Sequence, residues 1–61
     1  MEIFVIKNWS TKEEIKIEAI SWDIDKYQHN FYCVNDMQTS IVTQSYSCRY
    51  WDLVDRYDGR D

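Results

Sequence analysis

The clearest pattern in the chain is an alternation of apolar and polar residues over positions 14–25 that changes phase halfway. Apolar residues take the odd positions first and the even positions afterwards: Ile15, Ile17 and Ala19, then Ile20, Trp22 and Ile24. Because side chains on a strand point alternately to its two faces, an unbroken strand would bury one half and expose the other. The pattern therefore predicts a β-bulge or sharp bend at Ala19–Ile20, with Ile15, Ile17, Ile20 and Trp22 all pointing into one core.

Three further strands are predicted around this bent strand. Residues 2–7 are apolar on both faces, which favours a central strand, and the loop at 8–12 should join it to the bent strand as a hairpin. Residues 31–34 form a third strand, and a fourth begins at Thr39 or Ser40 after an Asn-Asp turn at 35–38. The better-buried face of the fourth strand should carry Val42, Tyr46 and Cys48.

The period of the pattern changes near the C-terminus. Apolar residues there follow the i, i+3, i+4, i+7 spacing of one helical face: Tyr50, Leu53, Val54 and Tyr57. A short helix over residues 49–58 is predicted, with Ser47 as N-cap, Gly59 at C′ and an Asp52–Arg56 ion pair. The alternative interpretation continues the fourth strand through Trp51.

The predicted fold is thus mainly β, a small α+β domain spanning residues 1–61. Its four-stranded antiparallel sheet should be strongly bent or barrel-like, with the short C-terminal helix packed against it. A domain of 61 residues buries only about 60% of its unfolded surface, and three Trp, five Tyr and two Phe supply most of its bulk.

Charge and composition narrow the function classes. Eleven acidic and seven basic residues give a net charge of −4, which disfavours binding to a phosphate backbone. One glycine excludes glycine-rich phosphate loops. The chain starts with Met-Glu-Ile-Phe, shows no signal-peptide pattern or membrane-length apolar run, and has two cysteines, so a cytoplasmic location is expected.

Few residues suggest catalysis or metal binding. His29, Cys33 and Cys48 lack the paired spacing of a zinc site, so no metal, cofactor or catalytic residue is expected. His29 is interpreted as an exposed loop residue, and the cysteines as buried thiols, with their meeting across two strands left open. Asp23 and Asp25 could act as an acid–base pair, but a solvated strand face is the favoured interpretation.

The density of aromatic residues exceeds what so small a core can hide, and Tyr and Trp are enriched at interface hot spots. We therefore expect a small non-enzymatic protein-binding module, of the kind that phages and mobile elements encode as inhibitors or accessory proteins against a host protein. The expected contact residues form an aromatic anchor with an acidic rim, suited to a partner with a basic surface: Trp51, Asp52, Asp55, Trp9 and Tyr57.

Two other functions stay open. One is a homo-oligomeric structural subunit with Trp9 or Trp51 at its interface, and the other is a single-strand nucleic-acid binder that stacks bases on its aromatic rings. Trp9 itself is interpreted either as a lid folded back onto the protein or as an exposed contact residue.

Overall fold

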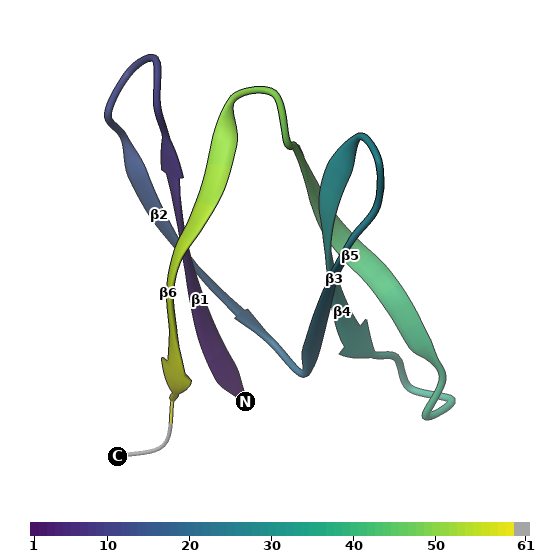
Figure 1. Ribbon diagram of the computed structural model, residues 1–61. Coiled ribbons are helices and arrows are strands. Elements are labelled where there is room, and N and C mark those ends of the chain that lie inside the picture. The colour runs from purple at the N-terminus through teal and green to yellow at the C-terminus, as the bar shows by residue number, and fades with distance from the viewer. Residues whose placement is uncertain (60–61) are drawn as a thin grey trace.

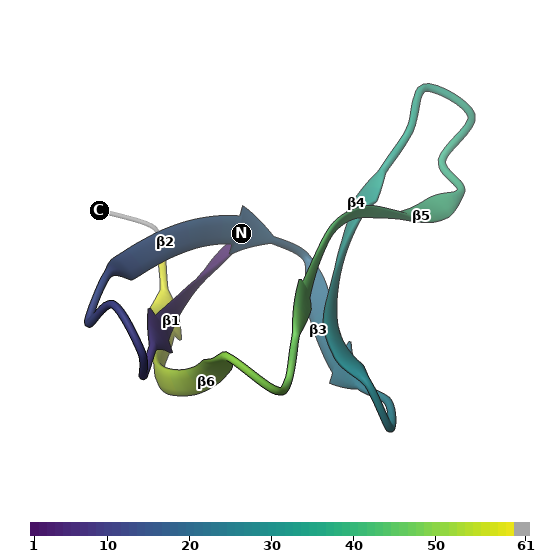
Figure 2. The ribbon, with the colours of Figure 1, turned by 90° about the horizontal axis from the view of Figure 1, so that it is seen from above.

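The computed structural model describes residues 1–59, which form two three-stranded antiparallel sheets that face each other (Figures 1 and 2). The first sheet has the order β2-β1-β6, with β1 at Glu2–Asn8, β2 at Glu14–Ala19 and β6 at Trp51–Asp58. The second has the order β3-β4-β5, with β3 at Ser21–Ile24, β4 at Gln28–Val34 and β5 at Ser40–Ser47. The prediction of a mainly β domain is confirmed, and the prediction of a single four-stranded sheet is wrong.

The break predicted in the alternating segment lies at Ile20, which separates β2 from β3. β2 pairs with β1 and β3 pairs with β4, so this one bent segment contributes to both sheets. The Ile20 amide donates to the carbonyl oxygen of Tyr32 at 2.9 Å, so the backbone at the bend is hydrogen-bonded to β4. Ile20 is the extra residue at this bend and is 39% exposed, whereas Ala19 is buried. The prediction that Ile20 points into the core is therefore wrong.

The predicted C-terminal helix is also wrong, because residues 51–58 form β6 and pair with the central strand β1. The register shifts between Val5 and Ile6: Ile6 lies opposite Leu53 and Val5 opposite Asp55, which leaves Val54 as an extra residue. Two consecutive apolar residues at a bulge imitate the i+3, i+4 step of a helical stripe. A lone helix of ten residues is marginal, and pairing with β1 instead satisfies the backbone along the whole segment.

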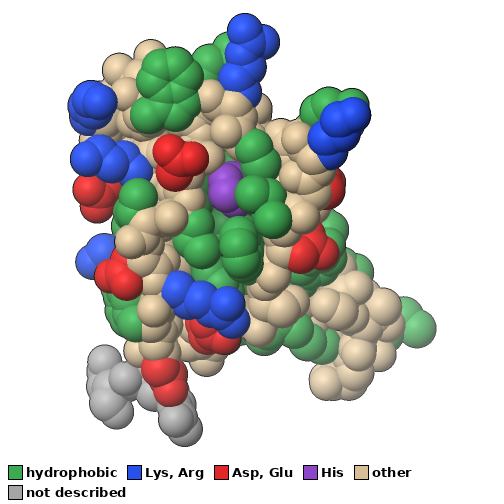
Figure 3. Space-filling view, viewed as in Figure 1, with side chains coloured by type: hydrophobic (Ala, Val, Ile, Leu, Met, Phe, Trp, Pro, Cys, Tyr) green, Lys and Arg blue, Asp and Glu red, His purple; other side chains and the backbone are tan. Residues whose placement is uncertain are grey.

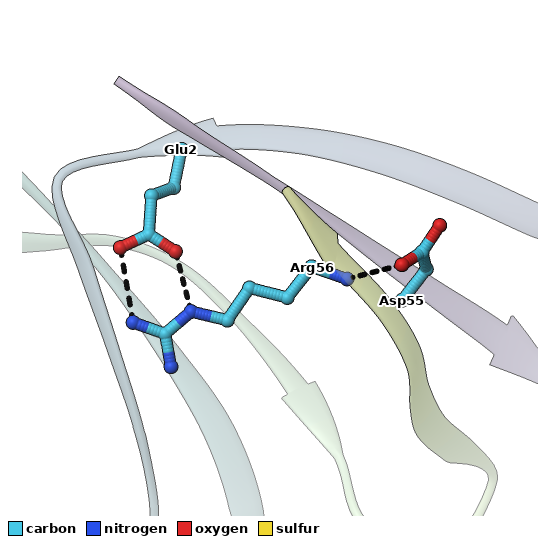
Figure 4. A network of polar contacts seen from close by, with 3 residues as sticks. All are labelled: Glu2, Asp55 and Arg56. Carbon is cyan, nitrogen blue, oxygen red and sulfur yellow. Dashed lines mark hydrogen bonds and ion pairs between the residues drawn. The ribbon is translucent and has the colours of Figure 1, made fainter. Parts of the chain in front are cut away.

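The groups predicted to cap that helix make other contacts. Ser47 Oγ accepts the Arg49 amide at 3.1 Å and closes the turn between β5 and β6. The Gly59 amide donates to the Met1 carbonyl oxygen at 2.9 Å, at the free end of the first sheet. Asp52 does not pair with Arg56, which instead forms a bidentate ion pair with Glu2 (Figure 4).

The Glu2–Arg56 pair also covers one end of the core. The Arg56 guanidinium lies 5.2 Å from the centre of the Phe4 ring. Its hydrogen bonds lower the pKa of the Glu2 carboxyl and raise the pKa of Arg56 itself. The backbone amide of Arg56 donates to Asp55 Oδ1 at 2.8 Å, as Figure 4 shows.

The core is a single layer of side chains between the sheets. Its buried members come from β1, β2 and β4, and half-buried residues surround them: Phe4, Ile6, Ile17, Ala19 and Phe31, with Ile15, Trp22, Cys33, Tyr46, Trp51 and Leu53. Val42, expected on the buried face of its strand, is 49% exposed. The β4–β5 register pairs Cys33 with Ile41 and Gln28 with Ser47, so the two cysteines lie at different ends of the sheet and do not meet.

Candidate binding surface

Three turns meet at one end of the molecule: those between β1 and β2, β3 and β4, and β5 and β6 (Figure 1). The Trp9 amide donates to the Tyr50 carbonyl oxygen at 3.0 Å, and the Cys48 amide donates to that of Tyr27 at 2.9 Å. These bonds hold three exposed aromatic residues at the same end: Trp9 is 53% exposed, Tyr27 70% and Tyr50 43%. We call this surface, made by Trp9, Lys26, Tyr27, Arg49 and Tyr50, the aromatic end.

The Trp9 side chain is exposed and yet held in place. Asn8 Oδ1 accepts the amides of Ser10 and Thr11 at 2.9 and 3.0 Å, which shapes the loop that carries the ring. The Trp9 indole Nε1 donates to the Arg49 carbonyl oxygen, and the ring stacks on Tyr50 with centroids 6.4 Å apart. Trp9 thus folds back onto the neighbouring turn and leaves about half of its surface in solvent, which combines the two interpretations offered by the sequence.

Cations accompany both tyrosines of the aromatic end. The Arg49 guanidinium lies 5.7 Å from the Tyr50 ring centre, and the Lys26 ammonium lies 5.5 Å from the Tyr27 ring centre. Figure 3 shows Lys and Arg side chains in blue around the upper rim of the molecule. Two of the three exposed rings at this end therefore each have a cation beside them, although the chain as a whole is acidic.

His29 supports the aromatic end from within the fold. It lies on β4 and is only 3% exposed, so the interpretation as an exposed loop residue is wrong. Its Nδ1 accepts the Trp22 indole Nε1–H at 3.2 Å, and its Nε2 lies 2.8 Å from the Trp51 carbonyl oxygen. Since an indole nitrogen only donates and a carbonyl oxygen only accepts, this arrangement requires the neutral imidazole with its proton on Nε2.

A continuous series of ring contacts runs from Trp51 into the core. Trp51 contacts Tyr46 edge-on with centroids 5.3 Å apart, Tyr46 contacts Phe31 at 6.2 Å, and Phe31 contacts Phe4 at 5.5 Å. Trp51 is half-buried and packs against the buried cluster. Trp51 therefore links the start of β6 to the core.

Four of the five contact residues predicted from the sequence lie on β6, and they fall on both faces of the first sheet. Trp51 shares the inner face with Ile6 and Leu53, whereas Asp52, Asp55 and Tyr57 lie opposite Lys7, Val5 and Ile3 on the outer face. The bulge at Val54 brings Asp52 and Asp55 to the same face, although they are three residues apart. Trp9 alone among the predicted residues belongs to the aromatic end.

The sequence reasoning missed Arg49, Tyr50, Lys26 and Tyr27 as surface partners of Trp9. In the helix predicted over residues 49–58, Tyr50 would face the sheet. A turn at Ser47 is equally compatible with this stretch of sequence, because serine side chains often bond the backbone of a turn. A turn at Ser47 would have placed the side chains of Arg49 and Tyr50 at a connection between two strands.

The other polar clusters are internally satisfied. Asn30 is buried, and its Nδ2 donates to Asp23 Oδ1 at 3.1 Å and to Asp25 Oδ2 at 3.2 Å. Tyr32 donates to Asp23 Oδ2 at 2.8 Å, which raises the pKa of the Tyr32 hydroxyl. Hydrogen bonds from the Tyr27 amide, the Asn30 side chain and the Gln28 amide lower the pKa of the Asp25 carboxyl. The two aspartates thus organise the β3–β4 hairpin.

A broad, open depression of about 680 Å³ lies at the other end of the first sheet, lined by Met1, Glu2, Ile20, Arg56, Tyr57 and Asp58. Its most prominent charges, Glu2 and Arg56, neutralise each other. Over residues 1–59, no three His, Cys, Asp or Glu side chains are grouped as metal ligands. The described residues also contain no helix that could cross a membrane.

Comparison of the chain with protein-family models, with curated proteins and with solved structures found no match.

Proposed function

We propose that this chain is a small non-enzymatic protein-binding module that contacts its partner through the aromatic end. The observation that carries the proposal is the cluster of Trp9, Arg49 and Tyr50, which exposes the three residue types most enriched at interface hot spots. A hot-spot cluster on one small surface is the feature by which such modules concentrate their binding energy.

The fixed geometry of this cluster favours binding over accidental exposure. Trp9 is held by a backbone hydrogen bond, an indole hydrogen bond and a ring stack, all directed to residues 49–50. A partner therefore meets rings that are already ordered, and association loses less side-chain entropy than it would with freely rotating residues.

The charges suggest the kind of protein surface that fits. Arg49 and Lys26 lie beside the rings, so a partner with an apolar recess and acidic groups around it complements the aromatic end. Asp52 and Asp55 face away on the outer side of β6, where they would meet basic groups on a partner large enough to reach round the strand. In this proposal, the basic surface expected on the partner lies beside the main contact and faces Asp52 and Asp55.

The test begins with affinity capture from the lysate of the native host, followed by titration of the identified partner against variants. Trp9→Ala should weaken binding by about 2 kcal/mol, roughly thirtyfold, with a circular dichroism spectrum like that of the parent. Tyr57→Ala is the matched control, because Tyr57 is similarly exposed but lies on the outer face of the first sheet. Loss of binding in the Tyr57 variant with full binding by the Trp9 variant would move the contact to the C-terminal strand.

Single-strand nucleic-acid binding is the second candidate, because Tyr27 and Tyr50 each present a ring beside a cation. The net charge of −4 opposes it. The test is binding to a labelled oligonucleotide at about 50 and about 200 mM salt, roughly the range in which such affinity falls steeply. A steep fall in affinity over this range, together with loss of binding in Tyr50→Ala, would favour this function over protein binding.

A further inference from the structure

The terminal strands of the two sheets differ in how their open edges are protected. β2 carries Glu14, Lys16 and Glu18, and β6 carries Asp52, Asp55, Arg56 and Asp58. β3 is only four residues long and includes Asp23. Charges and short length are the usual means by which proteins prevent strands from pairing edge to edge. β5, with the sequence SIVTQSYS, is eight residues long and has no charge, proline or glycine.

The unprotected edge coincides with exposed apolar side chains. Ile41 is 40% exposed and Val42 49%, one on each face of β5, and Val34 and Met37 nearby are also exposed. Figure 2 shows that the β4–β5 hairpin extends away from the first sheet, and within residues 1–59 no strand lies beyond this part of β5. The outer half of β5 is therefore both apolar and open to pairing.

The hydrogen-bond phase of the hairpin shows which backbone groups are available. The Asn35 amide donates to the Thr39 carbonyl oxygen at 3.0 Å, and the Thr39 amide donates to Asn35 Oδ1 at 3.0 Å, so these two residues occupy the position of a hydrogen-bonded pair. Such pairs alternate with non-hydrogen-bonded ones along an antiparallel ladder, so Ile41 bonds to Cys33 and both Ser40 and Val42 direct their amides and carbonyls away from β4. Thr43, the extra residue of a bulge, ends this straight stretch.

We propose that a second copy of this chain binds at the β5 edge, with the two β5 strands antiparallel about a two-fold axis at Ile41. In this register Ser40 of each copy pairs with Val42 of the other, and the outward amides and carbonyls of both residues form four backbone hydrogen bonds. The two Ile41 side chains then face each other in a non-hydrogen-bonded pair, and the Val42 side chains gather on the other face of the joined sheet.

Charge favours a second copy as the occupant. Two molecules of net charge −4 repel each other wherever their acidic strands meet, and β5 is the terminal strand at which they can approach without opposing like charges. A two-fold axis requires a surface that complements itself, and an uncharged strand with outward groups at alternate positions does so. The aromatic ends lie away from the hairpin tips (Figure 1) and stay exposed on both copies.

A cysteine cross-link tests the proposed register. Ile41→Cys is made in a background with Cys33 and Cys48 replaced by alanine, and oxidised without denaturant. Cα atoms in a non-hydrogen-bonded pair are about 4.5 Å apart, within the range that a disulfide spans, so most of the protein should become a covalent dimer. Ser45→Cys in the same background is the control, because Ser45 lies beyond the bulge and should cross-link at least tenfold less.

Sedimentation equilibrium of the unmodified chain provides the second measurement. The mass should rise from 7.5 kDa towards twice that value with concentration, and Val42→Lys, at an exposed position, should keep the β-sheet spectrum and remain at 7.5 kDa. A parent that stays monomeric at millimolar concentration would overturn the proposal and leave the edge to a strand from another protein. A dimer that persists in Val42→Lys, or that does not cross-link through residue 41, would equally overturn it.

Discussion

Replacement of His29 by phenylalanine tests how the two sheets are held together. His29 lies on β4, and its hydrogen bond to the Trp51 carbonyl oxygen on β6 joins the second sheet to the first, whereas its bond with Trp22 on β3 lies within the second sheet. Phenylalanine has a ring of similar size, and it keeps the packing while it removes both ring nitrogens. We expect His29→Phe to fold, with a lower free energy of unfolding.

The magnitude follows from the two groups that lose their partner. A buried polar group left without a hydrogen bond costs about 1–3 kcal/mol. The rings of Trp22 and Trp51 are half-buried, so water can reach their surroundings in part, and the lower half of that range applies to each group. The sum is about 2–4 kcal/mol, a large share of the roughly 3–9 kcal/mol available to a domain of this length.

Urea denaturation followed by circular dichroism measures this loss, with an unchanged m-value as the sign that the folded state is otherwise preserved. Trp22→Phe removes the donor alone, and the double variant completes a cycle that isolates the Trp22–His29 interaction from the rest. A His29→Phe variant within about 0.5 kcal/mol of the parent would refute the reasoning, because neither hydrogen bond could then contribute as described.

Three further predictions concern the turns, the C-terminal contact and the response to acid. Gln38 has a φ of 61°, so Gln38→Gly should raise the free energy of unfolding by about 0.5–1 kcal/mol, and Gln38→Ala should not, both measured in urea. A Cβ at Gly59 would lie 2.9 Å from the Met1 carbonyl oxygen, so Gly59→Ala should cost at least about 1 kcal/mol, and an unchanged melting temperature would contradict that contact. Folding lowers the pKa of both Glu2 and Asp25, so their stabilisation is present above the ordinary carboxyl pKa and is lost as pH falls below about 4. The melting temperature should drop there, and less steeply in Glu2→Gln and Asp25→Asn; equal slopes in all three proteins would exclude this origin.

The parts of the fold that could be predicted are those with strict two-residue periodicity. The phase change at Ala19–Ile20 located the bend, and the doubly apolar residues 2–7 identified β1 as a central strand. What the alternation could not show is which of the two residues at the bend stays inside. The side chain of Ala19 is small and still lies in phase with Ile15 and Ile17, so it remains in the core while the larger Ile20 becomes the extra residue.

The C-terminal segment shows why the remaining part was not predictable from the pattern alone. A bulge at Val54 places apolar residues at consecutive positions, and the resulting spacing of Tyr50, Leu53 and Tyr57 is the same as in a helix. Only the pairing with β1, some fifty residues away in sequence, distinguishes the two structures. The error at His29 has a similar origin, because its burial depends on the Trp51 carbonyl oxygen that the strand β6 supplies.

The shape of the molecule decides how its exposed aromatic residues are to be judged. The Cα atoms extend only 13 Å along the shortest axis, so the interior has room for one thin layer of buried side chains. Five residues fill that layer, and most Trp and Tyr side chains must then reach solvent, whatever they do. Exposure alone therefore does not identify a binding residue in this protein, and the fixation of an exposed ring is the more selective criterion. By this criterion Trp9, held by two hydrogen bonds and a stack, is the strongest candidate, and Tyr57, which forms no hydrogen bond or ring contact of this kind with the aromatic end, is the appropriate control.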